Sequence, residues 1–230
     1  MPISKTDFVR ALQCEKMLWL DAHRPDLKMI PPEVQARLEQ GNAFGDDAMG
    51  IFGAFKETTA YREDGRLDFA KMIENTKTLL EEGERVICEG SFSWYGNFCA
   101  VDILKKEKNG YALYEVKNAP APREEFLLDL AFQSFILRKC GIKILSASLI
   151  LNGEPTETDF DFEGITHNGR AYKIVTVSSQ TRERERLVSD NIFPFGKIKK
   201  KDAVEPTVPV GERCEKPYRC WYFEHCHNHS

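Results

Sequence analysis

The sequence predicts an α/β fold in which helices flank a mixed central sheet. Amphipathic helical segments occur before and after a group of strand-like segments. Asn109-Gly110 is the strongest short hairpin signal in the chain. The apolar residues of 143–153 run together rather than alternate with polar ones, which is typical of a strand buried on both faces. The 230 residues are enough for one large domain, and we expect a single domain over residues 1–230.

The N-terminal part is expected to be mainly helical. A polar capping segment precedes apolar residues at helical spacing over residues 4–20, and Cys14 falls inside this predicted helix. A second helix is expected to begin near residue 31 and to continue to residue 52. Residues 66–83 form a third amphipathic segment that ends at a glycine.

The strands are expected in the middle of the chain. A strand is predicted over residues 86–94. In a longer interpretation, residues 87–105 run as one strand into a polar turn, and residues 111–117 form the strand after that turn. The rest of the chain predicts an apolar helix, two strands, a charged helix and a linker: residues 123–140, 143–153, 171–179, 179–195 and 196–212.

The predicted hairpin gathers charged side chains on one face. Side chains alternate along a strand, so Glu115 and Lys117 share a face. Asp102 faces Lys117 if residues 109–110 form the loop, and faces Glu115 if residues 108–109 do; both registers place it on that same face. Two carboxylates and an ammonium group are costly to bury without a metal or a substrate. The alternative is an exposed hairpin face of mixed charge.

Two more residues are candidates for this site. Glu89 lies on the strand next to that of Asp102 and is a candidate extra carboxylate, the alternative being an exposed edge residue. Gln133 shares a helix face with Asp129. Because it stands among apolar residues, Gln133 needs a hydrogen-bond partner from the backbone or from a substrate.

Three cysteines close to the C-terminus suggest a metal or cluster site. They form a C-x5-C-x5-C pattern: Cys214, Cys220 and Cys226. An iron–sulfur cluster needs a fourth thiolate, which would come from one of the remaining cysteines: Cys14, Cys88, Cys99 or Cys140. Cys14 is favoured because domain termini often lie close together. Residues 1–22 and 210–230 would then combine as a cluster-binding subregion.

Zinc is the alternative ligand for these cysteines. Zinc sites usually pair cysteines two to four residues apart, which this spacing does not provide. Histidines near the C-terminus would have to complete such a site: His225, His227 and His229.

Composition excludes several classes of protein. The net charge is −4, so nucleic-acid contacts would have to come from local basic patches such as residues 197–201. No apolar run approaches the length of a membrane span, and the first residues do not resemble a signal peptide. We therefore expect a cytoplasmic protein without membrane contact.

Together, these motifs resemble those of a known nuclease family. With Asp102, the Glu115-Val116-Lys117 triplet, Gln133, and one early plus three late cysteines, the chain resembles the RecB-type nucleases of the PD-(D/E)XK superfamily. It is most similar to their iron–sulfur branch, which includes the CRISPR-associated RecB-like exonucleases and the helicase-linked AddB-type nuclease domains. The opening and closing segments also resemble a family of uncharacterised bacterial proteins with this nuclease domain.

The resemblance implies a restriction-endonuclease-like fold and a DNA nuclease that depends on Mg²⁺ or Mn²⁺. Such an enzyme acts on DNA ends or single strands, as an exonuclease or a single-strand endonuclease, with protein partners in CRISPR adaptation or DNA repair. By motif match, Asp102, Glu115 and the Val116 carbonyl would be metal ligands, Lys117 the catalytic lysine and Gln133 the glutamine of a Q-x3-Y motif. The resemblance also implies that Cys14, Cys214, Cys220 and Cys226 hold a 4Fe-4S cluster.

Two positions depart from the family pattern. Gly45 stands where the family often has a metal-binding histidine, and Leu137 replaces the tyrosine of Q-x3-Y. Glu39, Asp46 or Glu89 would have to substitute for the histidine. Two other functions therefore stay open: a catalytically inactive DNA-binding or assembly module with the same fold, and a zinc-stapled interaction domain.

Overall fold

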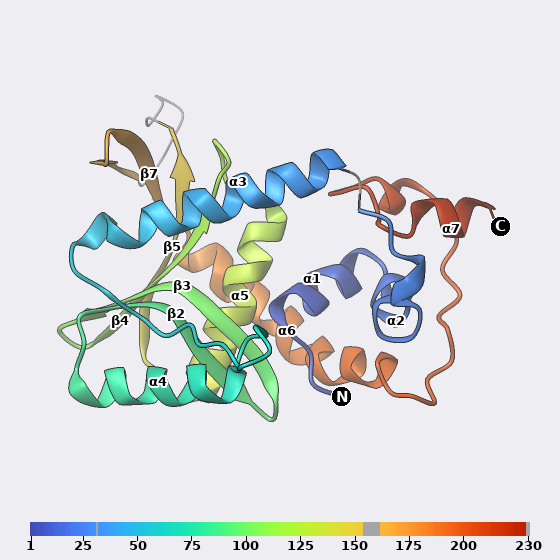
Figure 1. Ribbon diagram of the computed structural model, residues 1–230, viewed down its shortest axis with the longest axis horizontal. Coiled ribbons are helices and arrows are strands. Elements are labelled where there is room, and N and C mark those ends of the chain that lie inside the picture. Colours follow the sequence, from blue (N-terminus) through green and yellow to red (C-terminus); the bar gives the residue numbers. More distant parts are fainter. Residues whose placement is uncertain (31, 154–161, 229–230) are drawn as a thin grey trace.

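A central mixed sheet organises the molecule (Figure 1). The computed structural model describes residues 1–30, 32–153 and 162–228. Within these ranges the sheet has seven strands, in the order β1-β2-β3-β4-β5-β7-β6. Their bounds are β1 Lys56–Glu57, β2 Val86–Trp94, β3 Asn97–Glu107, β4 Gly110–Lys117, β5 Ile144–Asn152, β6 Phe162–His167 and β7 Arg170–Thr176.

The helices lie before, between and after the strands. The α-helices are α1 Lys5–Gln13, α2 Glu15–His23, α3 Pro32–Ala48, α4 Phe69–Glu82, α5 Glu124–Lys139, α6 Ser178–Ile198 and α7 Phe223–Asn228, and the short 3₁₀ helices are η1 Pro25–Leu27, η2 Met49–Phe52 and η3 Glu212–Cys214. In the part of the chain that the structure describes, no helix combines the length and apolar character needed to cross a bilayer.

The strand directions make the sheet mixed, as expected. β1 pairs with β2 and β4 pairs with β5 in parallel, and the other neighbours pair antiparallel. A parallel pair needs a crossover connection, which α5 provides between β4 and β5. This places α5 directly over the strand that carries Glu115 and Lys117.

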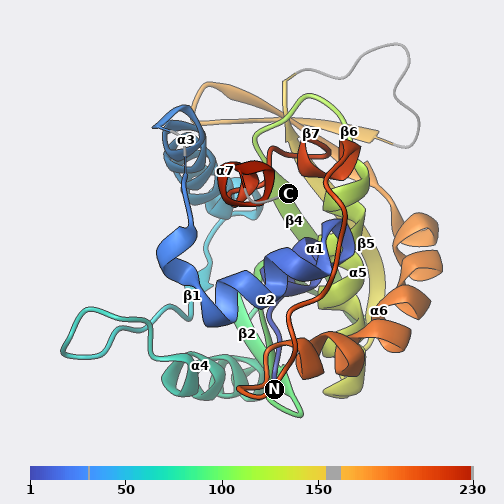
Figure 2. The same cartoon turned by 90° about the vertical axis from the view of Figure 1, so that its right-hand side faces the viewer.

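The two faces of the sheet are covered by different helices. On one face, α1, α5 and α6 form the larger core cluster with β2 to β5, and α5 is buried on nearly all sides. On the other face, the end of α3 and η2 place Phe44 and Ile51 against Val86, Ile103 and Tyr172. Figures 1 and 2 show α1 and α2 beside the C-terminal segment with α7.

The predicted single helix over residues 4–20 is wrong, because the chain breaks at Cys14. Cys14 has an extended backbone, with φ −162° and ψ 114°, and lies between α1 and α2. The break has a packing reason. Phe8 of α1 packs in the large core cluster, whereas Met17 and Leu20 of α2 pack against Tyr222 of the C-terminal segment. One continuous helix would not direct its apolar stripe to both places.

The strand predicted over residues 86–94 is confirmed as β2. The continuous strand expected over residues 87–105 is wrong, because this stretch contains a second hairpin. Tyr95 and Gly96 both have positive φ, 49° and 81°, and separate β2 from β3. The next hairpin has residues 108–109 as its loop, since Glu107 pairs with Gly110. Of the two registers considered, the structure therefore has the one in which Asp102 faces Glu115.

The other predicted elements are found with small shifts of their ends. The helix expected over residues 66–83 is α4, which begins after an Asp68 side-chain cap and ends at Gly83 in a left-handed conformation. The helix expected from residue 31 is α3 followed by η2, and residue 31 itself lies outside the described residues. β6 was not predicted from the sequence.

Candidate active site and cysteine pocket

Glu115 lies at the centre of a buried polar cluster between the sheet, α1 and α5. Its side chain is 1% exposed. Lys5 Nζ lies 2.9 and 3.1 Å from the two carboxylate oxygens, and Lys117 Nζ lies 2.8 Å from Oε1. Gln133 Nε2 donates a hydrogen bond to Oε2. Three donors from two helices and the same strand therefore hold one carboxylate.

Strand alternation separates Val116 from its neighbours. The Val116 side chain packs in the cluster on the far face of the sheet, with Phe52 of η2, while Glu115 and Lys117 face α5. The Val116 N–H donates to Asp102 Oδ2 at 2.6 Å. Val116 is thus joined to the polar cluster through its backbone.

Asp102 and Glu89 continue this cluster across β3 and β2. Asp102 follows the register of β3 and β4 to the position facing Glu115, and Glu89 lies beside Asp102 where the ladder between β2 and β3 is interrupted. The strand is irregular at Glu89, whose φ is +54°. Thr58 Oγ1 and Ser91 Oγ donate to the Glu89 carbonyl at 2.5 and 3.0 Å. Left-handed backbone at a non-glycine residue is costly and often occurs at functional sites.

The cluster contains more acids than bases. Lys117 Nζ lies 2.6 Å from Asp129 Oδ2, which adds a carboxylate from α5. Four carboxylates then face two ammonium groups: Glu89, Asp102, Glu115 and Asp129 against Lys5 and Lys117. When all are ionised, two negative charges have no counterpart among these groups.

The pKa shifts indicate which of these carboxylates are hardest to ionise. Burial and the charge of Asp102 raise the pKa of Glu89 to about 7, and burial and the charge of Glu115 raise the pKa of Asp102. Burial also opposes ionisation of Glu115, but the charges of Lys117 and Lys5 outweigh it and hold the pKa of Glu115 below its usual range. Burial also raises the pKa of Asp129, although Lys117 pairs with it. Glu89 and Asp102 are the two carboxylates of the cluster that no ammonium group of the described residues contacts directly, and Lys5 acts on them from a greater distance.

Lys5 belongs to this cluster, and the sequence reasoning missed it. It lies in the first turn of α1, after the Ser4 cap. A lysine at this position belongs to no sequence motif that would predict a contact with Glu115. Burial opposes its charge, but the carboxylates of Glu115 and Asp102 raise the pKa of Lys5. Asp129 had one weak signal, its helical spacing from Gln133.

Gln133 is buried, and its partner is the Glu115 side chain rather than the expected backbone group or substrate. Its side chain is fully buried and bonds Glu115 through Nε2. Its Oε1 is a buried acceptor without a hydrogen-bond partner in the described part of the chain, which is uncommon in folded proteins. Leu137, one turn later on α5, packs in the core and provides no polar group to this cluster.

Gly45, which stands where the similar nucleases often have a histidine, has free space around it. Gly45 lies in α3, and a Cβ added there would meet nothing within 4 Å. Two of the acids considered as substitutes, Glu39 and Asp46, have exposed side chains, and Glu39 accepts a hydrogen bond from Gln35. Of the three, Glu89 is the one that lies in the cluster with Asp102 and Glu115.

Four cysteines line one pocket between α2 and the C-terminal segment. They are Cys14, Cys214, Cys220 and Cys226. The break between α1 and α2 puts Cys14 at the pocket wall. Burial and the charges of the other three cysteines together raise the pKa of the Cys220 thiol to about 11. The Tyr222 N–H points at Cys220 Sγ at 3.4 Å, a contact of the kind that supports metal-bound sulfur.

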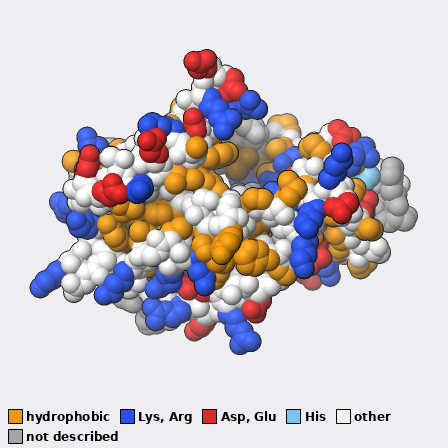
Figure 3. Space-filling view, turned by 90° about the horizontal axis from the view of Figure 1, so that it is seen from below, with side chains coloured by type: hydrophobic (Ala, Val, Ile, Leu, Met, Phe, Trp, Pro, Cys, Tyr) orange, Lys and Arg blue, Asp and Glu red, His pale blue; other side chains and the backbone are white. Residues whose placement is uncertain are grey.

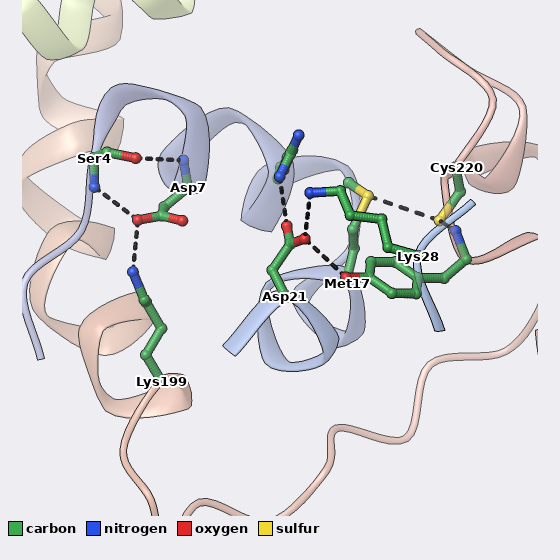
Figure 4. A network of polar contacts seen from close by, with 9 residues as sticks. Ser4, Asp7, Met17, Asp21, Lys28, Lys199 and Cys220 are labelled. Atoms are coloured by element: carbon green, nitrogen blue, oxygen red, sulfur yellow. Dashed lines mark hydrogen bonds and ion pairs between the residues drawn. The ribbon is translucent and has the colours of Figure 1, made fainter. Parts of the chain in front are cut away.

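A polar network fixes the pocket to the N-terminal helices (Figure 4). Asp21 of α2 binds Arg10 at 2.6 Å, Lys28 at 3.0 Å and the Tyr222 hydroxyl at 2.8 Å. Gln13 Nε2 donates to two carbonyl oxygens of the C-terminal segment, at 2.8 and 2.7 Å. Segments far apart in the sequence are thereby held together around the four thiols.

Among the described residues, the remaining candidate cysteines and histidines do not line this pocket. Cys88 and Cys99 are buried in the sheet and Cys140 is exposed at the end of α5. His227 stacks on Phe223 at 3.7 Å. His229, considered for a zinc site, lies outside the described residues.

Among residues 1–30, 32–153 and 162–228, no three His, Cys, Asp or Glu side chains have the arrangement of a preformed metal site. The donor chemistry nevertheless fits two different groups. The oxygens of Glu89 and Asp102 suit a hard divalent cation, and four thiols around one pocket suit an iron–sulfur cluster. No protein-family model matches the sequence, and no curated protein matches it.

Proposed function

We propose that this protein is a metal-dependent DNA nuclease that hydrolyses phosphodiester bonds at the Glu115 cluster. The surplus of two negative charges among its four carboxylates carries this proposal. One divalent cation would balance that surplus, and Glu89 and Asp102, whose pKa values are raised, are the groups from which bound metal would displace protons. The motif resemblance and the gathering of its residues on one face support the same function.

Asp102, Glu115 and Glu89 would hold Mg²⁺ or Mn²⁺ in this proposal. When bound, the ion supplies Lewis-acid activation of water and of the scissile phosphate. Lys117 holds an ammonium group at the cluster, because Asp129 and Glu115 raise its pKa against the effect of burial. That ammonium is available to orient the attacking water or to stabilise charge that develops on the phosphate.

The other residues of the cluster keep this arrangement in place. Gln133 fixes Glu115 Oε2, and Asp129 sets the position of Lys117 from α5.

A second proposal concerns the cysteine pocket, in which Cys14, Cys214, Cys220 and Cys226 would hold a structural 4Fe-4S cluster. The common pocket of these four thiols supports it, and zinc is the alternative.

A cleavage assay with Lys117→Met tests the nuclease. Loss of one preorganised catalytic charge costs roughly 10²–10³ in rate. We expect wild-type protein, purified without air, to cut end-labelled DNA with Mg²⁺ or Mn²⁺ and not with EDTA. We expect Lys117→Met to cut about 10²–10³ times more slowly. Lys71→Met, which removes an exposed lysine on α4, is the control and should cut normally.

Full activity in Lys117→Met would contradict the catalytic role of this lysine. DNA binding without cutting in the wild type would instead favour the inactive DNA-binding module of the same fold. Neither cutting nor DNA affinity at low salt would favour an interaction domain.

A further inference from the structure

An exposed aromatic surface lies where the β2–β3 turn meets α6. It consists of Trp94, Tyr95 and Phe193. The Trp94 ring lies 4.9 Å from that of Tyr95 and 5.6 Å from that of Phe193, and the Tyr95 and Phe193 rings lie 6.3 Å apart. Tyr95 is 78% exposed and Phe193 is 51% exposed. The turn is about 20 Å along β2 from Glu89, at roughly 3.3 Å per residue.

Neither the turn nor the core explains a tyrosine at position 95. Tyr95 and Gly96 form a two-residue hairpin loop with positive φ at both positions, for which asparagine and glycine are favoured. A bulky side chain is strained in that conformation. Because Tyr95 is also mostly exposed, its ring gains little from burial. The residue thus holds a backbone conformation that disfavours a bulky side chain while presenting an aromatic ring to solvent.

Lysines border this aromatic surface. Lys139 Nζ lies 5.4 Å from the centre of the Trp94 ring and 5.3 Å from that of Phe135. Lys197 lies one turn after Phe193 on α6, is exposed, and begins the basic segment 197–201. On the same helix, Asp190, one turn before Phe193, faces Arg186 at 3.6 Å. Two lysines, Lys139 and Lys197, therefore lie beside the rings or one helical turn from them. Figure 3 shows, on one face of the molecule, exposed hydrophobic side chains with Lys, Arg, Asp and Glu side chains around them.

We propose that the aromatic surface binds single-stranded nucleic acid. Unpaired bases would stack on the rings of Tyr95 and Phe193, and Lys139 and Lys197 would contact the phosphates. Exposed rings combined with a basic border are how proteins bind single strands without reading their sequence, whereas bases in a duplex have their faces covered. The choice of nucleic acid as ligand rests on the proposed nuclease function, to which this surface adds a binding site for unpaired strand.

The test measures binding of a fluorescent oligothymidine in EDTA, so that no cutting occurs. Stacking is worth about 1–3 kcal/mol per base, so we expect Tyr95→Asn and Phe193→Ala each to raise the Kd by roughly 5-fold to 150-fold. Tyr95→Asn should at the same time keep or raise the melting temperature, since asparagine suits the turn. Tyr61→Ala, which removes a ring that is 68% exposed in another loop, is the control and should bind normally.

Unchanged affinity in both Tyr95→Asn and Phe193→Ala would overturn the proposal, and so would an equal loss in Tyr61→Ala. Wild-type protein that does not bind oligothymidine at low salt would overturn it as well, even if it cuts duplex DNA. Binding that depends on these rings in a protein that never cuts would uphold this surface and refute the nuclease.

Discussion

The Lys5 ammonium group lies against the Glu115 carboxylate, which is also a proposed ligand of the divalent cation. This ammonium group contacts both oxygens of Glu115, while Lys117 and Gln133 bind the same side chain. Any cation that uses Glu115 as a ligand therefore meets an ammonium group that is already present. Lys5 would act as a resident counter-ion that metal must displace or repel.

Replacing Lys5 by methionine should strengthen metal binding. Two unit charges about 4 Å apart repel by about 1 kcal/mol in water and about 4 kcal/mol near a protein surface, so we expect Lys5→Met to lower the Kd of Mn²⁺ by roughly fivefold or more. Titration of metal-free protein followed by electron paramagnetic resonance measures this affinity directly. Lys71→Met, with the same change in net charge, should leave it unaltered, and weaker Mn²⁺ binding in Lys5→Met would show that Lys5 supports the metal site.

Glu89 gives the metal-free protein a distinctive dependence on pH. Because the pKa of Glu89 rises from 4.5 to about 7 on folding, the folded state binds this proton more tightly than the unfolded state does. The stabilisation that this proton gives to the folded state is therefore fully present below about pH 4.5 and is lost as the pH rises through about 7. Glu89→Gln, which stays neutral, should raise the melting temperature in EDTA more at pH 8 than at pH 5.

The matched comparison is wild-type protein with added Mn²⁺. A bound cation should remove the same penalty, so that metal stabilises the wild type more at pH 8 than Glu89→Gln. An equal effect of Glu89→Gln on melting at both pH values would contradict the raised pKa.

At the scale of elements, the sequence predicted what depends on local signals. Three signals of this kind each lie within a short stretch of sequence: the continuous apolar run of β5, the amphipathic pattern of α4 and the polar loop between β3 and β4. Strand alternation also predicted that Glu115, Lys117 and Asp102 share a face. The exact register stayed open, because two adjacent turn positions were equally compatible with the sequence.

The elements that were missed depend on contacts distant in the sequence. The break at Cys14 exists because α1 packs against α5 and α6 while α2 packs against Tyr222. The turn at Tyr95 lacks the usual residue at its first position. Lys5 reaches Glu115 across 110 residues of chain. None of these leaves a periodic or compositional pattern in a single sequence.

At the scale of the whole molecule, the cysteine pocket joins the two ends of the chain. The C-terminal segment also reaches α5, where the Tyr218 hydroxyl donates to Glu125 at 2.9 Å. Burial and the contact with Glu125 raise the pKa of Tyr218 to about 12, so its hydroxyl keeps its proton. The pocket is thus part of the frame that holds α1, α2 and α5 together.

Iron analysis of cysteine variants tests the proposed cluster. We expect wild-type protein purified without air to be brown, with about four irons per chain. Cys14→Ala should lose the iron and the visible absorbance and should melt at a lower temperature. Cys140→Ala, outside the pocket, should keep all three properties; zinc without iron in the wild type would reject the cluster.

One short helix connects the two centres. α1 begins at Lys5, which binds Glu115, and the next residue after its end is Cys14, at about 13 Å for nine residues at 1.5 Å each. If filling the pocket holds α1 in place, it also holds Lys5 against Glu115, where Lys5 opposes a divalent cation. Thermodynamic reciprocity then requires each site to affect the other by the same factor. The two centres would be negatively coupled, and the affinity of one would report the occupancy of the other.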